Sequence, residues 1–357
     1  MSRTLTPDDI ESLAVGAWIL GTGGGGSPYL SLLNLRSLYR DGKRVALIAP
    51  GDLDDEALVG IVAGVGAPLV GQERLADSRL AAHAVEVMAR HLGEPFAALM
   101  SMEIGGSNGL RPLLAAAHLG LPVVDADCMG RAWPEAQMTS LAVGGLAPGP
   151  SAAVDPRGLD TIVHAVPDWR WAERVGRQVC VEYGSAATTC RPHRGAEIKA
   201  WGIAGTTTRA IALGDAVRAA QSRHDDPVAA LLAAEPGRRL FTGKIVDVAR
   251  RATAGFLRGS ARLDGLDADK GTSLRLDFQN EWIVAWRDGT AIAMSPDLIC
   301  VLDTQSGEAV GTETVRYGQR VSVIALPPAP LFLSEKGLAH VGPRAFGYDL
   351  DYRSAFA

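Results

Sequence analysis

The sequence predicts a two-domain protein with an α/β domain first and a β-rich, barrel-like domain after it. The chain has 357 residues, more than one compact core usually holds. Apolar strands alternate with amphipathic helices to about residue 165, which predicts a mainly parallel sheet with helices on its faces. Short strand-like segments follow from about residue 240. We therefore expect an α/β domain over residues 1–165 and a C-terminal domain over residues 166–357, which begins with a helical joint to about residue 239.

The chain opens with two predicted helices joined by glycines. Thr6 before Pro7 is typical of a helix start, and apolar residues then recur at helical spacing. A glycine-rich segment follows at residues 21–26. Ser27 as a cap and Pro28 in the first turn predict a second helix that reaches about residue 39. The glycines are therefore expected at a helix N-terminus.

In the rest of the first domain, segments with the apolar periodicity of helices alternate with segments typical of strands. Helices are predicted at residues 77–92 and 110–119, and strands at residues 44–49, 57–65, 96–100, 121–125 and 161–166.

The predicted secondary structure of the second domain changes from helices to short strands part-way along. Helices are predicted at residues 208–221 and 228–234, the latter with Asp226 as its cap. Asp288 and Gly289 form a hairpin turn between two short strands. The predicted strands are residues 244–248, 255–263, 273–278, 283–286 and 291–294, which fit a small barrel better than further βαβ units.

Composition excludes several classes of protein. The net charge is −5 and no dense Lys/Arg block occurs, so nucleic acid is not an expected partner. No apolar stretch is long enough for a membrane helix, and the N-terminus lacks the apolar core of a signal peptide, so we expect a cytoplasmic protein without a membrane segment. The four cysteines form no C-x-x-C pair, and the seven histidines form no H-E-x-x-H motif.

We consider four interpretations of the glycine-rich segment. Gly21, Gly23 and Gly26 match G-x-G-x-x-G, but a helix precedes them where a dinucleotide site needs a strand. No Lys-Ser/Thr pair follows, which excludes a P-loop. Either the segment is a structural turn, or its amides approach an anionic ligand at the helix N-terminus. We favour ligand binding; the candidate residues are Gly21, Thr22, Gly23, Gly24, Gly25, Gly26 and Ser27.

Polar clusters follow two strands, where ligands of open α/β sheets bind. In an extended chain Asp125 and Asp127 point to one face, and two such carboxylates require a shared proton, a cation or a metal ion. Both are candidate ligands of a divalent metal, with zinc as the first candidate. Alternatively, the aspartates cap helices or pair with Arg131, and Cys128 is a core residue. The candidate catalytic residues are Glu103, Asp125, Asp127 and Cys128, and Asn108 and Arg131 are candidate ligand-binding residues.

Several segments together resemble one family, the S-methyl-thiohydantoin desulfurase-like family. They are residues 21–29, 103–108 and 123–127 in the first half and 241–244, 278–281, 296–300 and 342–349 in the second. The resemblance implies a three-layer α/β first domain and a β-barrel-like second domain. It also implies kinship with hydantoinase and oxoprolinase systems, which act on five-membered cyclic amides.

These observations favour an enzyme that attacks a polarised C=N or C=O carbon of a thiohydantoin or cyclic amide. The attacking water would be activated by Glu103, Asp125 and Asp127, with or without a divalent metal, and the amides of residues 23–26 would hold the oxyanion. The expected partner is a small anionic or cyclic amide substrate, and a homo-oligomer remains open. The alternative is a non-catalytic metabolite-binding or regulatory subunit of a hydantoin/oxoproline pathway; a nucleotide-dependent oxidoreductase comes third.

Overall fold

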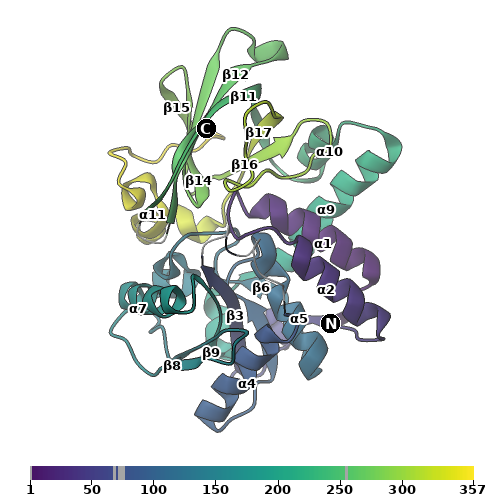
Figure 1. Cartoon of the computed structure of the whole chain (residues 1–357), viewed down its shortest axis with the longest axis vertical. Helices are drawn as coiled ribbons and strands as arrows, with labels where there is room; N and C mark the ends of the chain where they lie inside the picture. Colours follow the sequence, from purple (N-terminus) through teal and green to yellow (C-terminus); the bar gives the residue numbers. More distant parts are fainter. Residues whose placement is uncertain (1, 67–69, 71–76, 254–255) are drawn as a thin grey trace.

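The structure is a computed structural model, and it describes the chain except for residues 1, 67–69, 71–76 and 254–255. Two parts lie one above the other in Figure 1, with the α/β part below and the β-rich part above. Each is built on its own large sheet. The predicted α/β plus β fold is confirmed.

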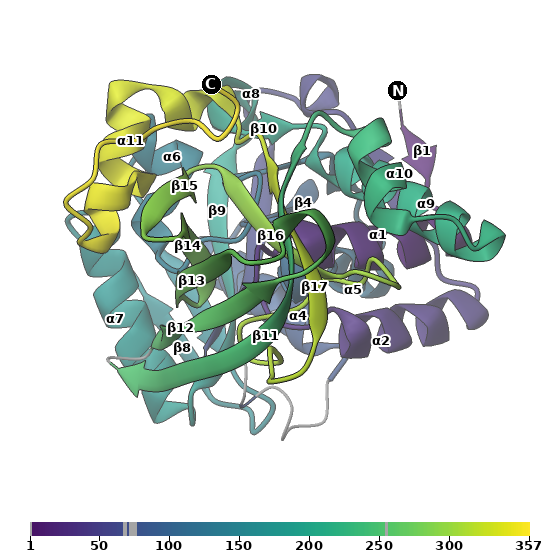
Figure 2. The same cartoon turned by 90° about the horizontal axis from the view of Figure 1, so that it is seen from above.

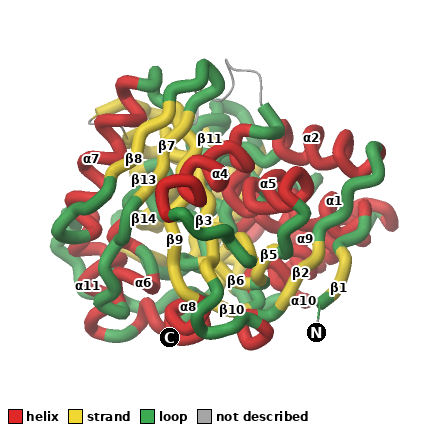
Figure 3. Tube along the Cα trace, turned by 90° about the horizontal axis from the view of Figure 1, so that it is seen from below, coloured by secondary structure: helices red, strands yellow, loops and turns green. Residues whose placement is uncertain are grey.

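The first sheet has eight strands in the order β1-β2-β5-β4-β3-β9-β7-β8. Strands β2, β5, β4 and β3 run parallel and form its centre, while the pairings outside them are antiparallel. Figure 3 shows the sheet crossing the molecule from β8 to β1. The strands are β1 (Arg3–Thr4), β2 (Ala46–Ile48), β3 (Leu58–Gly66), β4 (Ala98–Ser101), β5 (Val123–Val124), β7 (Ser151–Val154), β8 (Asp160–Val163) and β9 (Ala186–Arg194).

Helices cover both faces of this sheet. Alternate residues of β3 point to opposite sides, so Val62 packs with α4 (Leu80–Leu92) and α5 (Arg111–Leu119). Ile61 packs on the other side, in a cluster with residues of α6 (Ser140–Val143), α7 (Trp169–Glu182), α8 (Gly195–Trp201) and α11 (Glu335–Val341). The helices and the sheet between them form three layers. Because both faces of the sheet are buried, β3 consists largely of apolar residues.

The opening helices depart from expectation at one cap. Helix α1 (Pro7–Leu20) begins with the predicted cap, because Thr6 and Asp9 form a reciprocal capping box. Helix α2 (Tyr29–Arg40) has Pro28 as its N-cap with no side-chain cap. The Ser27 hydroxyl accepts only a long hydrogen bond of 3.4 Å from the amide of Tyr29.

The segment between the two large sheets contains more than helices. Strand β9 pairs antiparallel with β3 along its full length, so residues assigned from the sequence to the C-terminal half complete the first sheet. Strand β10 (Ile203–Ala204) then pairs with β6 (Ala126–Asp127). Helix α9 (Thr206–Arg223) packs on α1, where a Cβ on Gly16 would overlap the backbone of α9. Helix α10 (Pro227–Ala234) starts at the predicted Asp226 cap.

The second sheet is an antiparallel, curled half-barrel in the order β15-β14-β13-β12-β11-β17-β16 (Figure 2). The predicted turn at Asp288 and Gly289 joins β14 to β15, and both residues have positive φ, as a type I′ turn requires. Residue 255, where one strand was expected to begin, lies outside the described residues. The strands are β11 (Arg238–Thr253), β12 (Phe256–Gly265), β13 (Ser273–Gln279), β14 (Glu281–Arg287), β15 (Thr290–Met294), β16 (Leu298–Asp303) and β17 (Arg320–Leu326).

Short 3₁₀ helices complete the fold, and one of them shapes the site: residues Gly106–Gly109 connect β4 to α5. The others are Pro50–Asp52, Ala136–Met138, Asp267–Asp269, Pro330–Leu333 and Pro343–Phe346. Among the described residues, no helix has the length and apolarity needed to cross a membrane.

Candidate functional site

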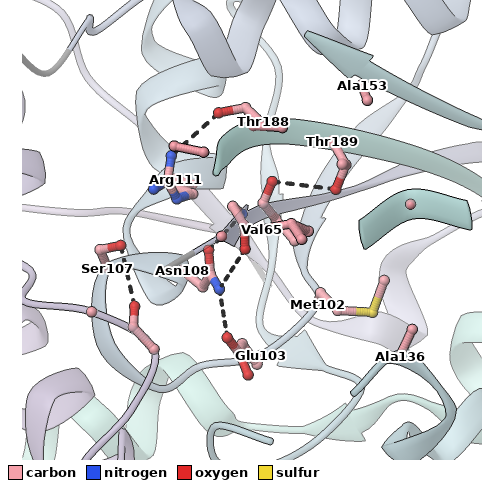
Figure 4. A pocket seen from close by; sticks show the side chains of 18 of the residues that line it. Val65, Met102, Glu103, Ser107, Asn108, Arg111, Ala136, Ala153, Thr188 and Thr189 are labelled. Carbon is pink, nitrogen blue, oxygen red and sulfur yellow. Dashed lines mark hydrogen bonds between the residues drawn. The ribbon is translucent and has the colours of Figure 1, made fainter. Parts of the chain in front are cut away.

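A pocket of about 500 Å³ lies where the two parts of the chain meet. It opens beyond the carboxyl ends of β3 and β4, where open α/β sheets bind ligands. Figure 4 shows side chains from both strand ends and from β9 pointing into it. Its polar lining includes Gly25, Gly26, Ser27, Glu103, Ser107, Asn108, Arg111, Thr188, Thr189 and Arg191 from the first part and Asn280, Glu281, Glu313 and Thr314 from the second.

Glu103, two residues after β4, is buried and lines this pocket, as do the more exposed carboxyls of Asp77, Glu135 and Glu173. Asn108 Nδ2 donates a hydrogen bond to Glu103 Oε1 at 2.5 Å (Figure 4). The backbone N–H of Trp133 donates to Glu103 Oε2 at 3.0 Å. Burial nevertheless raises the pKa of Glu103 to about 7. A carboxyl with this pKa can accept or release a proton at neutral pH, as a general base or acid must.

Arg111, at the first residue of α5, brings a positive charge into the same pocket. Its Nη1 lies 3.4 Å from the hydroxyl of Thr188, and its Nε has no hydrogen-bond partner among the described residues. Burial lowers the pKa of Arg111, although the charge of Glu103 opposes this. The side chain occupies the space beside Gly64, where a Cβ would come within 2.5 Å of Cζ. An incompletely paired, buried guanidinium is suited to bind an anionic group.

The glycine-rich segment divides into two halves with different roles. Gly25 and Gly26 line the pocket with Ser27, and their carbonyls accept hydrogen bonds from the amide of Ser107. Both glycines have positive φ. Their own N–H groups have no hydrogen-bond partner in the described part of the chain. This half can therefore donate hydrogen bonds to a ligand.

The first half of the segment instead holds the two domains together. The amide of Trp282 donates to Thr22 O, and that of Thr312 donates to Gly23 O, both at 2.8 Å. A Cβ on Gly24 would overlap the carboxyl of Glu281. Glycine is thus needed here for close approach to the second domain. Gly21, Thr22, Gly23 and Gly24 were expected to bind a ligand, but they do not line the pocket.

Comparison with known proteins is consistent with this two-part architecture. Residues 8–165 match the model of the S-Me-THD-like N-terminal domain, and residues 167–355 match the S-Me-THD-like C-terminal domain. The chain belongs to the S-Me-THD-like family. A crystal structure of a protein from Chromobacterium violaceum is similar over 99% of this chain and 100% of that one, with a TM-score of 0.80 and 24% identity, which supports the fold alone. No curated protein matches.

Arg131 of this S-Me-THD-like protein is buried beside the pocket and does not line it. Its guanidinium donates to Thr22 Oγ1 at 2.5 Å and to Asp297 O at 3.0 Å, and it stacks 3.9 Å from the ring of Trp133. The side chain therefore joins the glycine-rich segment to the second domain. Arg131 was expected to bind a ligand, but it is not among the residues that line the pocket. Its positive charge acts to lower the pKa of Glu103, which opposes the effect of burial.

Asp125 and Asp127, which were expected to form one catalytic site, have different hydrogen-bond partners. The carboxylate of Asp125 accepts from the amide and hydroxyl of Thr208, at the start of α9. Asp127 is fully buried and accepts from the amides of Ile104 and Gly130, at 2.7 and 2.8 Å. Each carboxyl has its own donors, although burial raises the pKa of Asp127 to about 7. The two share no hydrogen-bond partner among these, and neither lines the pocket. The alternative reading, a structural role, fits these contacts better.

Cys128 and the metal prediction find no support in this arrangement. Cys128 is fully buried outside the pocket, and burial raises the pKa of its thiol well above the ordinary value, which disfavours a nucleophilic thiolate. Within the described residues, no group of three or more His, Cys, Asp and Glu side chains is placed to hold a metal ion. A zinc site remains a prediction from the sequence.

Sequence reasoning missed the residues that reach the pocket from elsewhere in the chain. Glu281 and Glu313 come from the second domain and are 2% and 7% exposed, and the Oε2 atom of each has no hydrogen-bond partner in the described structure. Burial raises the pKa of both, that of Glu313 to about 7. The one indication in the sequence was Glu281 at the start of an apolar strand, where a charged residue is unusual.

Proposed function

We propose that this chain is a desulfurase-type hydrolase that attacks a ring carbon of a thiohydantoin-like cyclic amide with water activated by Glu103. The observation that supports this most is the Glu103 carboxyl itself, which lies in a two-domain pocket and has a pKa of about 7. Family membership supports a thiohydantoin-related substrate. The pocket volume of about 500 Å³ is ample for a single small ring with substituents.

The proposed reaction uses groups that line the pocket. Glu103 removes a proton from water, and the water oxygen bonds to the ring carbon that carries the methylthio group in an S-methyl-thiohydantoin. The C=N electron pair moves toward the ring nitrogen, and its developing charge is stabilised by N–H donors such as those of Gly25 and Gly26. The C–S bond then breaks, the sulfur gains a proton, and methanethiol leaves a hydantoin behind.

Arg111 is a reason to expect an anionic substituent on the substrate. Its guanidinium is buried and incompletely paired, so an anion bound there would gain a charge-assisted hydrogen bond. Arg191, on β9, also lines the pocket. Substrates that carry a carboxylate away from the reacting carbon are therefore expected to bind better than neutral analogues.

The proposal is tested by offering the purified protein a panel of S-methyl-thiohydantoins, hydantoins and related cyclic amides. Wild-type protein is expected to release methanethiol or an opened ring, while Glu103→Gln loses this activity. Glu86→Gln is the matched control, because Glu86 lies on α4 outside the pocket and pairs with Arg79 and His83. Thermal stabilisation by these compounds without any product would instead indicate a binding protein and refute the enzyme.

A further inference from the structure

A second carboxyl faces the pocket from the other domain. Glu281 is the first residue of β14, is 2% exposed and lines the same pocket as Glu103. Its Oε2 atom has no hydrogen-bond partner among the described residues. A buried carboxyl oxygen without a partner costs free energy, so its retention calls for an explanation in terms of a ligand or a reaction.

The glycine-rich segment makes room for this carboxyl. A Cβ on Gly24 would overlap Oε1 of Glu281, and neighbouring backbone bonds between the domains fix the spacing. Gly24 itself does not have positive φ. The glycine is thus needed for the space it leaves beside Glu281, and not for backbone conformation.

Burial and the charge of Glu103 keep the proton on Glu281. Burial raises its pKa well above the ordinary value, the charge of Glu103 raises it further, and Arg131 opposes both. Glu313 adds a smaller effect in the same direction as Glu103. When Glu103 is ionised, Glu281 therefore holds its proton. Two carboxyls with different protonation states at one site can divide the roles of acid and base.

We propose that Glu281 is a catalytic residue, the general acid that protonates the leaving sulfur as Glu103 activates water on the ring carbon. This rests on the proposed function and extends it to the second domain. One C–O bond forms and one C–S bond breaks. Glu103 gains the proton that water loses, Glu281 gives its proton to the sulfur, and transfer from Glu103 to Glu281 restores both carboxyls. The net reaction consumes one water and releases one thiol.

Glu313 is distinguished from Glu281 by its neighbours. It also lines the pocket with an unpartnered Oε2, but the charge that acts on it is that of Arg250, and Glu103 is not among its influences. The charge of Glu103 therefore favours a proton on Glu281 and not on Glu313. Glu313→Gln is the matched control for Glu281→Gln, because both variants replace a buried carboxyl by an amide of the same shape.

The test compares two substrates that differ in the basicity of the leaving thiolate. One is an S-methyl-thiohydantoin, and the other carries a 2,2,2-trifluoroethylthio group, whose thiolate is a weaker base and leaves more easily without protonation. Glu281→Gln is expected to slow release of methanethiol by about 10²–10⁴-fold, and release of trifluoroethanethiol by at least about tenfold less. Glu103→Gln should slow both reactions equally, and Glu313→Gln should keep the wild-type ratio between the two substrates.

The outcomes separate this inference from the function on which it rests. If wild-type protein releases neither thiol, the proposed function fails and the inference fails with it. If wild-type protein is active and Glu281→Gln slows both reactions by the same factor, the inference alone is overturned. If Glu281→Gln does not fold, the same comparison of substrates is made with Gly24→Ala, because the added methyl group displaces the carboxyl of Glu281. It should show the same selective loss, and an unchanged ratio between the substrates would overturn the inference.

Discussion

Asn108 fixes the carboxyl of Glu103 to the central sheet. Its Nδ2 donates to Glu103 Oε1 at 2.5 Å, while its Oδ1 accepts from the amide of Gly64, in β3, at 2.7 Å. The hydroxyl of Ser101 binds the carbonyls of both residues. The Glu103 carboxyl is thus fixed to β3, the neighbour of β4. Four consequences of the contacts around the site can be measured.

Asn108→Ala should move the pH dependence of turnover. The lost hydrogen bond stabilises the ionised form of Glu103, so without it the pKa of Glu103 rises further above its ordinary value. We expect the rising limb of the profile of kcat/KM against pH to shift upward by about one unit. Activity lost at pH 7 should then be largely recovered at pH 9, and a loss that is equal at all pH values would contradict this role.

Gly64→Ala should impair binding of anionic substrates by displacing Arg111. The new Cβ would come within 2.5 Å of Arg111 Cζ, and a flexible guanidinium is the group that yields. Both Gly64→Ala and Arg111→Gln are expected to raise KM for carboxylate-bearing substrates by about ten- to a hundredfold, from the usual strength of a hydrogen bond to a charged group. Neutral analogues should change little. Gly51→Ala, which has open space around it, is the control.

Asp127→Asn should destabilise the fold. Asp127 Oδ2 accepts from the amides of Ile104 and Gly130, and Oδ1 accepts from Gly130 as well. The amide nitrogen of Asn replaces one acceptor oxygen by a donor, which then faces the buried N–H of Ile104 or Gly130, at a cost of about 1–3 kcal/mol. Urea unfolding measures this cost. A variant that keeps wild-type stability and loses turnover would return Asp127 to the catalytic role expected from the sequence.

Stability should fall as the pH rises through neutrality. The pKa of Glu103 and that of Glu313 are raised by burial from 4.5 to about 7 in the folded protein. Each therefore contributes stability that is fully present below about pH 4.5, and is lost as the pH rises through about 7. Urea midpoints measured from pH 5 to pH 8 should decline, and Glu313→Gln should flatten the decline. An equal slope in this variant would exclude the contribution of Glu313.

Local features of the fold could be predicted where one short segment decides the outcome. The capping residues Thr6 and Asp226 and the turn at Asp288 and Gly289 act through contacts within four residues. Strand β9 was missed because its residues, AATTCRPHR, are largely polar, and they form a strand by pairing with the distant β3. Tertiary pairing overrode local propensity there.

The site likewise combines residues that local sequence could predict with contacts that only tertiary structure creates. Glu103 and Asn108 could be predicted because ligands bind beyond strand ends, and both follow β4 closely. The contact of Gly24 with Glu281 depends on the docking of two domains, which no local pattern encodes. Asp125 and Asp127 were expected to share one face of an extended chain, but Asp125 lies between β5 and β6, which belong to different sheets. Their joint catalytic role stays a prediction.

The central claim is that Glu103 is the base in this pocket, and the profile of kcat/KM against pH tests it most directly. With an S-methyl-thiohydantoin substrate, wild-type protein should gain activity as the pH rises through about 7, where Glu103 ionises. Glu103→Gln should retain its fold, lose about 10²–10⁴-fold in activity and lose that rise with pH. Wild-type turnover by Glu103→Gln with the rise unchanged would contradict the claim.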